Sequence, residues 1–209
     1  MLQRINPEKP QEDLIHQAVA CLRNGGVIIY PTDTFYALGC DIQHKKAVER
    51  LCRIKGLDPA KAQYSCICED MKTVGEYCLH LSTPMYKIIK RAFPGPYTFV
   101  LQASRKVPRH FQTRKTLGVR IPSHPVPQLL LHHLGNPIAS MSVDQDEDDP
   151  DYGRDPDLIW DRYQSKVDMM LSGGYGNYMA STIIDMSRGE EDIEVLREGM
   201  GALAPLGLD

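Results

Sequence analysis

Polar oxygens are concentrated in one short segment that follows an apolar run. Residues 27–30 are mostly β-branched, and the run ends at Pro31, whose nitrogen cannot donate a hydrogen bond to a sheet. The side chains that follow carry hydroxyl or carboxyl groups: Thr32, Asp33, Thr34 and Tyr36. A buried strand that empties into polar residues is how open α/β sheets form ligand crevices. The segment therefore predicts a loop that binds a small polar ligand, although Thr and Asp are also ordinary turn formers.

Three basic residues stand where they could neutralise an anion. Lys55 precedes Gly56 at the expected end of a helix, and Arg120 alternates with apolar residues in an expected strand. Arg197 ends another expected strand. A guanidinium on a sheet surface can clamp a carboxylate or phosphate through two parallel hydrogen bonds. The alternatives are structural: Lys55 as a partner of the helix dipole, and Arg120 as an outward-facing arginine.

Small hydroxyls recur near the ends of two further expected strands. Ser140, Ser142 and Asp144 are spaced by two, so a strand would place them on one face. Ser181 and Thr182 begin a later strand, which together with the strand that carries Arg197 could line one cavity. Such groups suit a phosphate or an adenylate.

Helices and strands alternate early in the chain, and strands cluster late. Helices are expected from Pro10 to Gly25, from Ala47 to Gly56, and over 70–78, 82–93, 124–134 and 155–163. Strands are expected over 27–30, 64–68, 97–102, 117–121, around Ile138, and over 167–171, 181–186 and 193–197. Gly39 is expected to permit a turn after the polar loop. This order predicts an α/β fold with a twisted, open, mixed sheet flanked by helices.

Length and composition are those of one globular domain. The 209 residues, 42% hydrophobic and 24% charged, are expected to form a single domain over 1–209 with a core of about 10–201. We expect no signal peptide and no membrane span, because no apolar run approaches the ~20 residues required. The six cysteines include no CxxC pair, which indicates reduced thiols and a cytoplasmic protein.

Charge is unevenly distributed along the chain. Acidic residues are absent from Tyr77 to Val143, whereas nine basic residues lie there, including Arg105, Lys106 and Arg109. A dense acidic segment follows from Asp144 to Asp161. A basic half predicts a polyanionic ligand such as RNA. The alternative is a solvated surface whose charges segregate only in sequence.

We expect no metal site built from protein ligands alone. Asp144, Asp146 and Asp148 alternate like calcium ligands, but Asp149 stands where an EF-hand loop requires glycine. Mg²⁺ held by Asp144 and a neighbour stays an alternative to a solvated loop. The adjacent His132 and His133 are interpreted as the end of a helix.

Taken in order, these motifs resemble the YrdC/YciO family of threonylcarbamoyl-adenylate synthase-like proteins, most of all its YciO branch. The similarity extends from about residue 10 to residue 201. The motifs that carry it are the Tyr30–Pro31–Thr32–Asp33 loop, Arg53–Ile54–Lys55, Pro94–Gly95–Pro96, Val119–Arg120–Ile121–Pro122, Ser140 with Ser142, Ser181–Thr182–Ile183–Ile184–Asp185, and Arg197 with Gly199.

The resemblance implies a YrdC-like fold with a concave basic face that can bind double-stranded RNA or tRNA. It also implies a reaction, in which threonine, bicarbonate and ATP, with Mg²⁺, give threonylcarbamoyl-AMP and pyrophosphate for tRNA modification. Thr32 and Tyr36 would contact threonine, and Arg120 would hold its carboxylate. The remaining implied roles are nucleotide binding by Lys55, Ser140, Ser142, Asp144 and Arg197, cavity lining by Ser181 and Thr182, catalysis by Lys55, Arg120 and Arg197, and RNA binding by Arg105, Lys106 and Arg109.

Two positions depart from the family pattern. Leu57 stands where the family has arginine, and Asp144 stands where it has asparagine. The first change removes a cation and the second adds an anion near the expected phosphates. The alternatives to an efficient synthase are a non-catalytic RNA-binding relative and an enzyme that uses ATP with a different small carboxylate.

Overall fold

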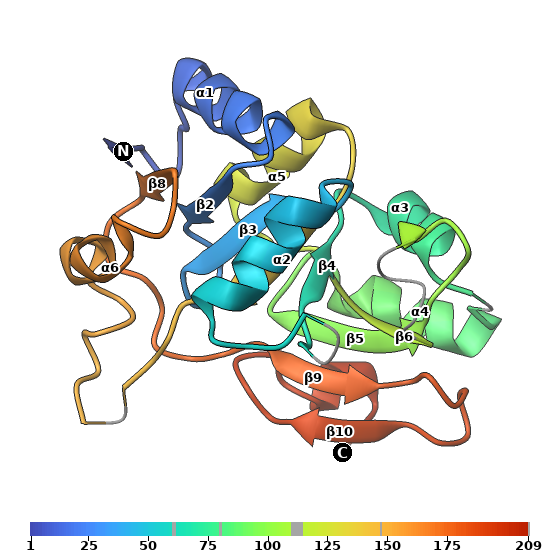
Figure 1. Cartoon of the computed structure of the whole chain (residues 1–209). Coiled ribbons are helices and arrows are strands. Elements are labelled where there is room, and N and C mark those ends of the chain that lie inside the picture. Colours follow the sequence, from blue (N-terminus) through green and yellow to red (C-terminus); the bar gives the residue numbers. More distant parts are fainter. Residues whose placement is uncertain (60–61, 80, 110–114, 147, 209) are drawn as a thin grey trace.

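The computed structural model describes residues 1–59, 62–79, 81–109, 115–146 and 148–208. Within these residues one ten-stranded sheet runs in the order β1-β8-β2-β3-β7-β4-β6-β5-β9-β10 (Figure 1). The strands are β1 (Leu2–Arg4), β2 (Val27–Tyr30), β3 (Ala37–Asp41), β4 (Ser65–Ile67), β5 (Tyr97–Gln102), β6 (Thr116–Arg120), β7 (Ile138–Ser142), β8 (Met169–Ser172), β9 (Thr182–Asp185) and β10 (Glu194–Arg197). The helices are α1 (Glu12–Arg23), α2 (Lys45–Ile54), α3 (Met71–Tyr77), α4 (Thr83–Ala92), α5 (Pro125–Leu134) and α6 (Pro156–Tyr163).

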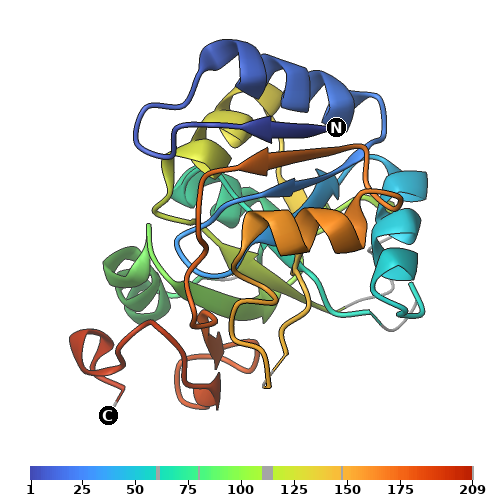
Figure 2. The ribbon, with the colours of Figure 1, turned by 90° about the vertical axis from the view of Figure 1, so that its left-hand side faces the viewer.

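The sheet is mixed, which confirms the predicted fold class. Parallel pairs join β1 to β8, β8 to β2, β4 to β6 and β5 to β9, and the other neighbours are antiparallel. Ten strands that each rotate against their neighbour by about 20–25° produce a strongly twisted sheet. The view from the side shows β1 and β8 running beneath α1 (Figure 2).

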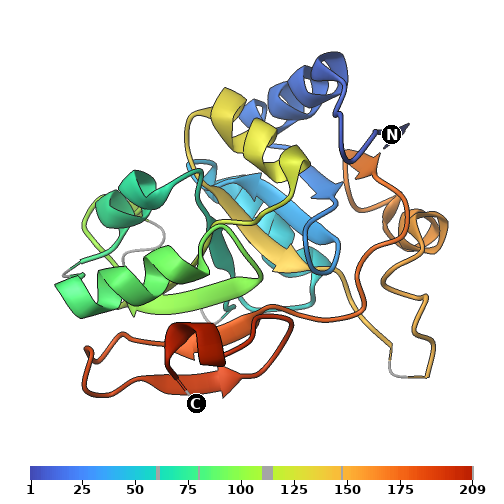
Figure 3. The same ribbon diagram turned by 180° about the vertical axis from the view of Figure 1, so that it is seen from behind.

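Two apolar clusters cover the two faces of the sheet. On one face, α1 and α5 pack on β2, β7 and β8 through residues such as Ile15, Leu22 and Leu130. The other face is covered by α2, α3, α4 and α6, which bury residues such as Leu51, Ile89 and Tyr163. From behind, α4 lies beside the short C-terminal 3-10 helix Ala204–Leu206 (Figure 3). The apolar cluster of α1 and α5 includes residues of β8, β2, β3, β7 and β4, but none of β6, β5 or β9. On the same face of the sheet, a cavity forms over these last three strands.

Local signals begin and end the helices as expected. Asp70 and Ser82 accept hydrogen bonds from backbone N–H groups in the first turns of α3 and α4. His132 and His133 occupy the last turn of α5, which ends at Gly135 with a positive φ of 79°. The interpretation of the histidine pair as a helix end is therefore confirmed.

The cysteines are free thiols, as predicted. All except Cys21 are buried, and burial is the main cause that raises the pKa of Cys40 and Cys78 above the ordinary range. Such thiols are poor nucleophiles at neutral pH. In the described part of the chain, helices are all too short or too polar to cross a bilayer.

The expected turn at Gly39 is wrong, because Gly39 lies inside strand β3, which pairs antiparallel with β2. The polar loop is thus the connection of a hairpin, residues 31–36. Gly39 is needed for packing rather than for a turn. A Cβ atom built on it would lie 2.7 Å from both Tyr30 Cε1 and Ile138 Cγ2.

Replacing Gly39 with alanine is expected to lower the free energy of unfolding by about 1–3 kcal/mol, because the buried ring of Tyr30 must move. Urea unfolding measures this change. Gly75→Ala is the matched control, since a Cβ there meets open space. An equal loss of stability in both variants would contradict the packing explanation.

Candidate functional site

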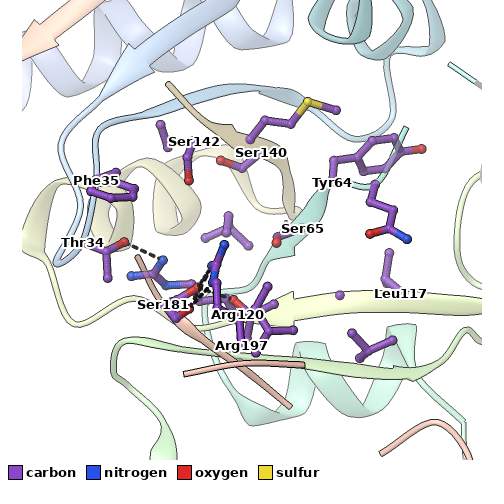
Figure 4. Close-up of a pocket in the computed structure, with 18 of the residues that line it drawn as sticks. Thr34, Phe35, Tyr64, Ser65, Leu117, Arg120, Ser140, Ser142, Ser181 and Arg197 are labelled. Carbon is purple, nitrogen blue, oxygen red and sulfur yellow. Dashed lines mark hydrogen bonds between the residues drawn. The ribbon is translucent and has the colours of Figure 1, made fainter. Parts of the chain in front are cut away.

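A cavity of about 770 Å³ lies where the polar loop meets the uncovered face of the sheet (Figure 4). Its floor comes from β4, β5, β6, β7 and β9, and one wall comes from the loop between β2 and β3. The predicted site residues that line it are Thr32, Lys55, Arg120, Ser140, Ser142, Ser181 and Arg197. Residues distant in the sequence are thus brought to one hollow, as the strand-end motifs predicted.

Arg120 projects from the end of β6 toward the polar loop. Its Nη1 donates to Thr34 Oγ1 over 2.8 Å, and its Nη2 forms an ion pair with Asp33. Ser123 donates from its backbone N–H and its hydroxyl to the second oxygen of Asp33. Arg120 is 8% exposed, and within the described residues its Nε–H meets no acceptor. The guanidinium is therefore fixed in place, with two of its five N–H groups used by Thr34 and Asp33 and its Nε–H left unsatisfied.

Arg197 lies beside Arg120 in the cavity (Figure 4). Its Nε and Nη2 donate to the backbone oxygen of Ser181 over 3.0 and 2.8 Å. Burial, and then the charge of Arg120, lower the pKa of Arg197. In the described part of the chain no carboxylate is paired with Arg197. A desolvated cation beside a second cation favours the binding of an anion.

Lys55 and Asp144 form an ion pair at the rim. Lys55 Nζ also donates to the backbone oxygen of Ser142 over 2.9 Å. The other oxygen of Asp144 accepts from Arg162 and from the hydroxyl of Tyr163, both over 2.8 Å. Although burial raises the pKa of Asp144, hydrogen bonds from Lys55 and Tyr163 and the nearby cations hold it below its ordinary value.

This network sets the position of the Asp144 carboxylate, and its nucleotide-binding role stays a prediction. The residue does not line the cavity, and its carboxylate faces α6 and Lys55 instead of a free phosphate site. Two cations already neutralise it, so it does not act as an isolated repelling charge. Instead it holds the ammonium group of Lys55 against the backbone of β7.

Some hydroxyl groups of the site already form hydrogen bonds within the protein. Ser140 donates to the backbone oxygen of Leu38 over 3.0 Å and lies 2.8 Å from the hydroxyl of Tyr30. Thr32 donates to the backbone oxygen of Phe35 over 2.7 Å, which closes the polar loop. Ser142 is exposed and lines the cavity. Ser142 is thus the hydroxyl most open to a ligand.

Two further predicted residues do not line the cavity. Tyr36 is 1% exposed, donates to the backbone oxygen of Gly174 over 2.6 Å and accepts from the N–H of Gly173. Thr182 is fully buried and donates to the backbone oxygen of Gly201. Neighbouring residues of a strand point to opposite faces, so Ser181 and Thr182 could not both face the cavity. Tyr36 and Thr182 thus form hydrogen bonds to the backbone of segments beside the site, at Gly173, Gly174 and Gly201.

Several lining residues received no individual role in the sequence analysis. Thr34 and Phe35 lie in the predicted loop, and Tyr64, Ser65 and Lys115 come from the β4 and β6 edges. Ser65 pairs in register with Gly118 and Ser140. Alternation along β4 could have indicated Ser65, but only if the pairing partners of β4 had been known.

The residues predicted to bind RNA lie away from the cavity. Arg105, Lys106 and Arg109 belong to the connection between β5 and β6, and Lys106 forms an ion pair with Glu76 of α3 over 2.5 Å. Among the other basic residues that the structure describes in the acid-free run from Tyr77 to Val143, Lys87, Lys90 and Arg91 lie on α4, which covers the opposite face, and Lys115 and Arg120 line the cavity. The run therefore does not fold into one surface, and RNA binding by this connection stays a prediction.

A magnesium ion would find few protein ligands here. Asp185 is the single carboxylate among the described lining residues, and its Oδ1 already accepts from the N–H of Ser187. Mg²⁺ commonly binds through substrate phosphates with few protein ligands. The donor set therefore fits Mg²⁺ that arrives with a nucleotide.

Comparisons with known proteins agree with the fold and with the family resemblance of the sequence. The family model of Sua5, YciO and YrdC proteins, described as "Telomere recombination", matches residues 20–199. The uncharacterized protein YciO of Escherichia coli K12 is 40% identical over 203 residues, which are 96% of each chain. Its crystal structure superposes with a TM-score of 0.88 at 38% identity, covering 99% of this chain and 98% of that one.

Two relatives carry functional names. A threonylcarbamoyl-AMP synthase of Coxiella burnetii is 32% identical over 179 residues, 84% of this chain and 94% of the relative. The crystal structure of P. abyssi Sua5 complexed with L-threonine has a TM-score of 0.84 at 25% identity, and covers 95% of this chain and 57% of that one. With the fold and the order of motifs, these matches show that the chain belongs to the Sua5/YciO/YrdC family.

Proposed function

We propose that the cavity binds ATP together with a small carboxylate such as threonine, and joins the carbamate of threonine and bicarbonate to AMP with release of pyrophosphate. The observation that carries this proposal is the charge of the cavity. Its described lining holds four cationic residues and one carboxylate, and Arg197 is desolvated beside Arg120 without an acidic partner. Anionic ligands would compensate these charges.

In this proposal, three of the four cations each bind a part of the substrate. Arg120 lies beside the hydroxyl loop and presents a planar fork, which suits the amino acid's carboxylate. Lys55 and Arg197, with Ser142, lie around the remaining space and suit the phosphates. The cavity's size is within the range for a nucleotide-sized ligand.

The chemistry follows from that placement. Threonine and bicarbonate condense, with loss of water, to a carbamate on the amino nitrogen. A carbamate oxygen attacks the α-phosphorus of ATP, and the bond to pyrophosphate breaks in line. Lys55 and Arg197 would stabilise the charge that develops on the phosphates, while Arg120 keeps the amino acid oriented. Mg²⁺ bound to the nucleotide would supply further charge neutralisation.

Two features set the expected rate and specificity apart from those of the relatives named as synthases. Leu57 lines the rim where the family pattern has arginine, and Asp144 withdraws Lys55 into an ion pair. The missing arginine and the ion pair each lower the positive charge that the cavity offers to the phosphates of ATP. We therefore expect a slow threonine reaction, or a faster one with another small carboxylate.

Nucleotide binding is expected to raise the melting temperature. At 100 times its dissociation constant, ATP with Mg²⁺ should add about 2.7 kcal/mol to the free energy of unfolding. Lys55→Ala and Arg197→Ala should each reduce the shift, because each removes a cation from the cavity. Differential scanning fluorimetry measures it.

Matched controls lie near these residues in the chain and outside the described lining of the cavity. Lys46→Ala removes an exposed lysine of α2, and Arg188→Ala removes an exposed arginine near β9 that pairs with Asp192 and Glu194. Both should keep the full shift. An absence of any shift in the wild type at millimolar ATP would remove the nucleotide part of the proposal.

A further inference from the structure

Three metal-ligating side chains meet on the surface of α1 and α5, two helices that contribute nothing to the described lining of the cavity. Glu12 and His16 are one turn apart on α1, and His133 lies in the last turn of α5. One ligand atom from each of the three lies within 4.8 Å of the others. The sequence analysis interpreted His133 together with His132 as the end of a helix, and the partners of His133 lie on another helix.

The separations fit a shared metal ion. His133 Nε2 lies 3.0 Å from Glu12 Oε2, and His16 Nε2 lies 3.8 Å from the same oxygen. In a tetrahedral zinc site, with metal–ligand distances of about 2.0–2.2 Å, neighbouring ligand atoms are about 3.4 Å apart. The observed distances bracket that value, so small side-chain rotations would complete the site.

The backbone under the three ligands is held firmly. Arg23, at the end of α1, donates to the backbone oxygen of His133 over 2.6 Å. Below the cluster, Ile15 and Val19 of α1 share an apolar core with Leu130 and Leu134 of α5. The two helices therefore present the ligands on a fixed scaffold, which lowers the cost of collecting them around an ion.

The two imidazole rings are also arranged with respect to each other. The rings of His16 and His133 pack edge to face with centroids 4.7 Å apart. As exposed histidine–carboxylate contacts, the Glu12 pairs contribute little to stability. A cation bound by Glu12, His16 and His133 would stabilise the same arrangement more strongly.

We propose that Glu12, His16 and His133 form a binding site for a zinc-class divalent cation. Two nitrogens and one oxygen suit Zn²⁺ and its neighbours Co²⁺, Ni²⁺ and Cu²⁺, whereas Mg²⁺ and Ca²⁺ prefer oxygen ligands. Water would complete the coordination, because the cluster faces solvent. The ion would link the first turn of α1 to the last turn of α5 and so stabilise the helix layer on that face.

The test uses chelator-treated full-length protein and Zn²⁺ alone. Isothermal titration calorimetry should give one Zn²⁺ per chain, and the melting temperature should rise with Zn²⁺, return to its starting value with EDTA and ignore Mg²⁺. His16→Ala and His133→Ala should each abolish the site. His132→Ala is the matched control, because His132 adjoins His133 but contacts Glu69 instead. It should bind Zn²⁺ like the wild type.

Cobalt separates this site from the cysteines. Co²⁺ bound to two imidazoles and a carboxylate gives visible d–d bands without a thiolate charge-transfer band. The proposal would be overturned by a strong thiolate band, by zinc binding that survives in the His16→Ala/His133→Ala double variant, or by equal losses in His132→Ala. The experiment does not depend on ATP or on any amino acid, so its outcome is independent of the proposed function.

Discussion

Arg120→Ala is expected to weaken binding of threonine, or of the preferred carboxylate, by at least about 100-fold. Two charge-assisted hydrogen bonds to a carboxylate are each worth about 1.5–3 kcal/mol, and a factor of 100 needs only about 2.7 kcal/mol. The variant also leaves Asp33, whose side chain is 12% exposed, without its cation. That carboxylate would repel the ligand in the same place. Isothermal titration calorimetry of the amino acid with and without ATP measures the loss.

Stability must be measured beside affinity, since breaking a buried ion pair costs about 3–5 kcal/mol. Asp33→Asn is the matched variant that separates the two effects. It breaks the same pair and should also destabilise the fold, but it releases Arg120 and removes the competing anion. Ligand affinity should therefore fall in Arg120→Ala and be kept or increased in Asp33→Asn. A parallel fall in both variants would mean that Arg120 acts through the fold and not through the ligand.

The double variant Leu57→Arg/Asp144→Asn is expected to raise threonine-dependent pyrophosphate release by at least about tenfold, which corresponds to about 1.4 kcal/mol in the barrier. Arginine at the rim would add a cation, and asparagine would release Lys55 from its ion pair. Because both changes act on the same phosphates, their effects should be coupled rather than additive.

The controls for this variant lie in the same acidic segment. Asp146→Asn removes the same charge from an exposed carboxylate and should leave the rate unchanged. Arg162 and Tyr163 can still bond an asparagine side chain, so the double variant should fold. If it folds, binds ATP and shows no gain, the two positions do not limit the reaction, and a different carboxylate becomes the better explanation.

Most elements could be predicted from local patterns, and the exceptions have physical causes. Strand β3 was missed because Ala37, Leu38 and Gly39 lack β-branched side chains, and glycine is unfavourable in strands. Gly39 is tolerated there because the ring of Tyr30 occupies the space above it. Strand β1 is three residues long and pairs with β8 at the other end of the chain, so no local signal marks it.

The site was predicted by residue type but not by orientation. Lys55, Arg120 and Arg197 do converge, because strand ends and helix ends of such a sheet share one edge. The partners of Asp144 could not be predicted, since Arg162 and Tyr163 reach it only through the packing of α6. The orientation of Thr182 could not be predicted either, because the strand register, and not the residue type, determines on which face of β9 its side chain lies.

The most direct test of the central claim is pyrophosphate release by the wild-type chain with ATP, Mg²⁺ and bicarbonate, measured with each amino acid in turn. We predict release that requires one amino acid or a small group of them, with threonine among the substrates or replaced by a similar small carboxylate. The same activity should be lost in Arg197→Ala and kept in Arg188→Ala. Release that is independent of every amino acid, or that is unchanged in Arg197→Ala, would contradict the assignment of this cavity as the site where the carbamate of a bound amino acid is adenylated.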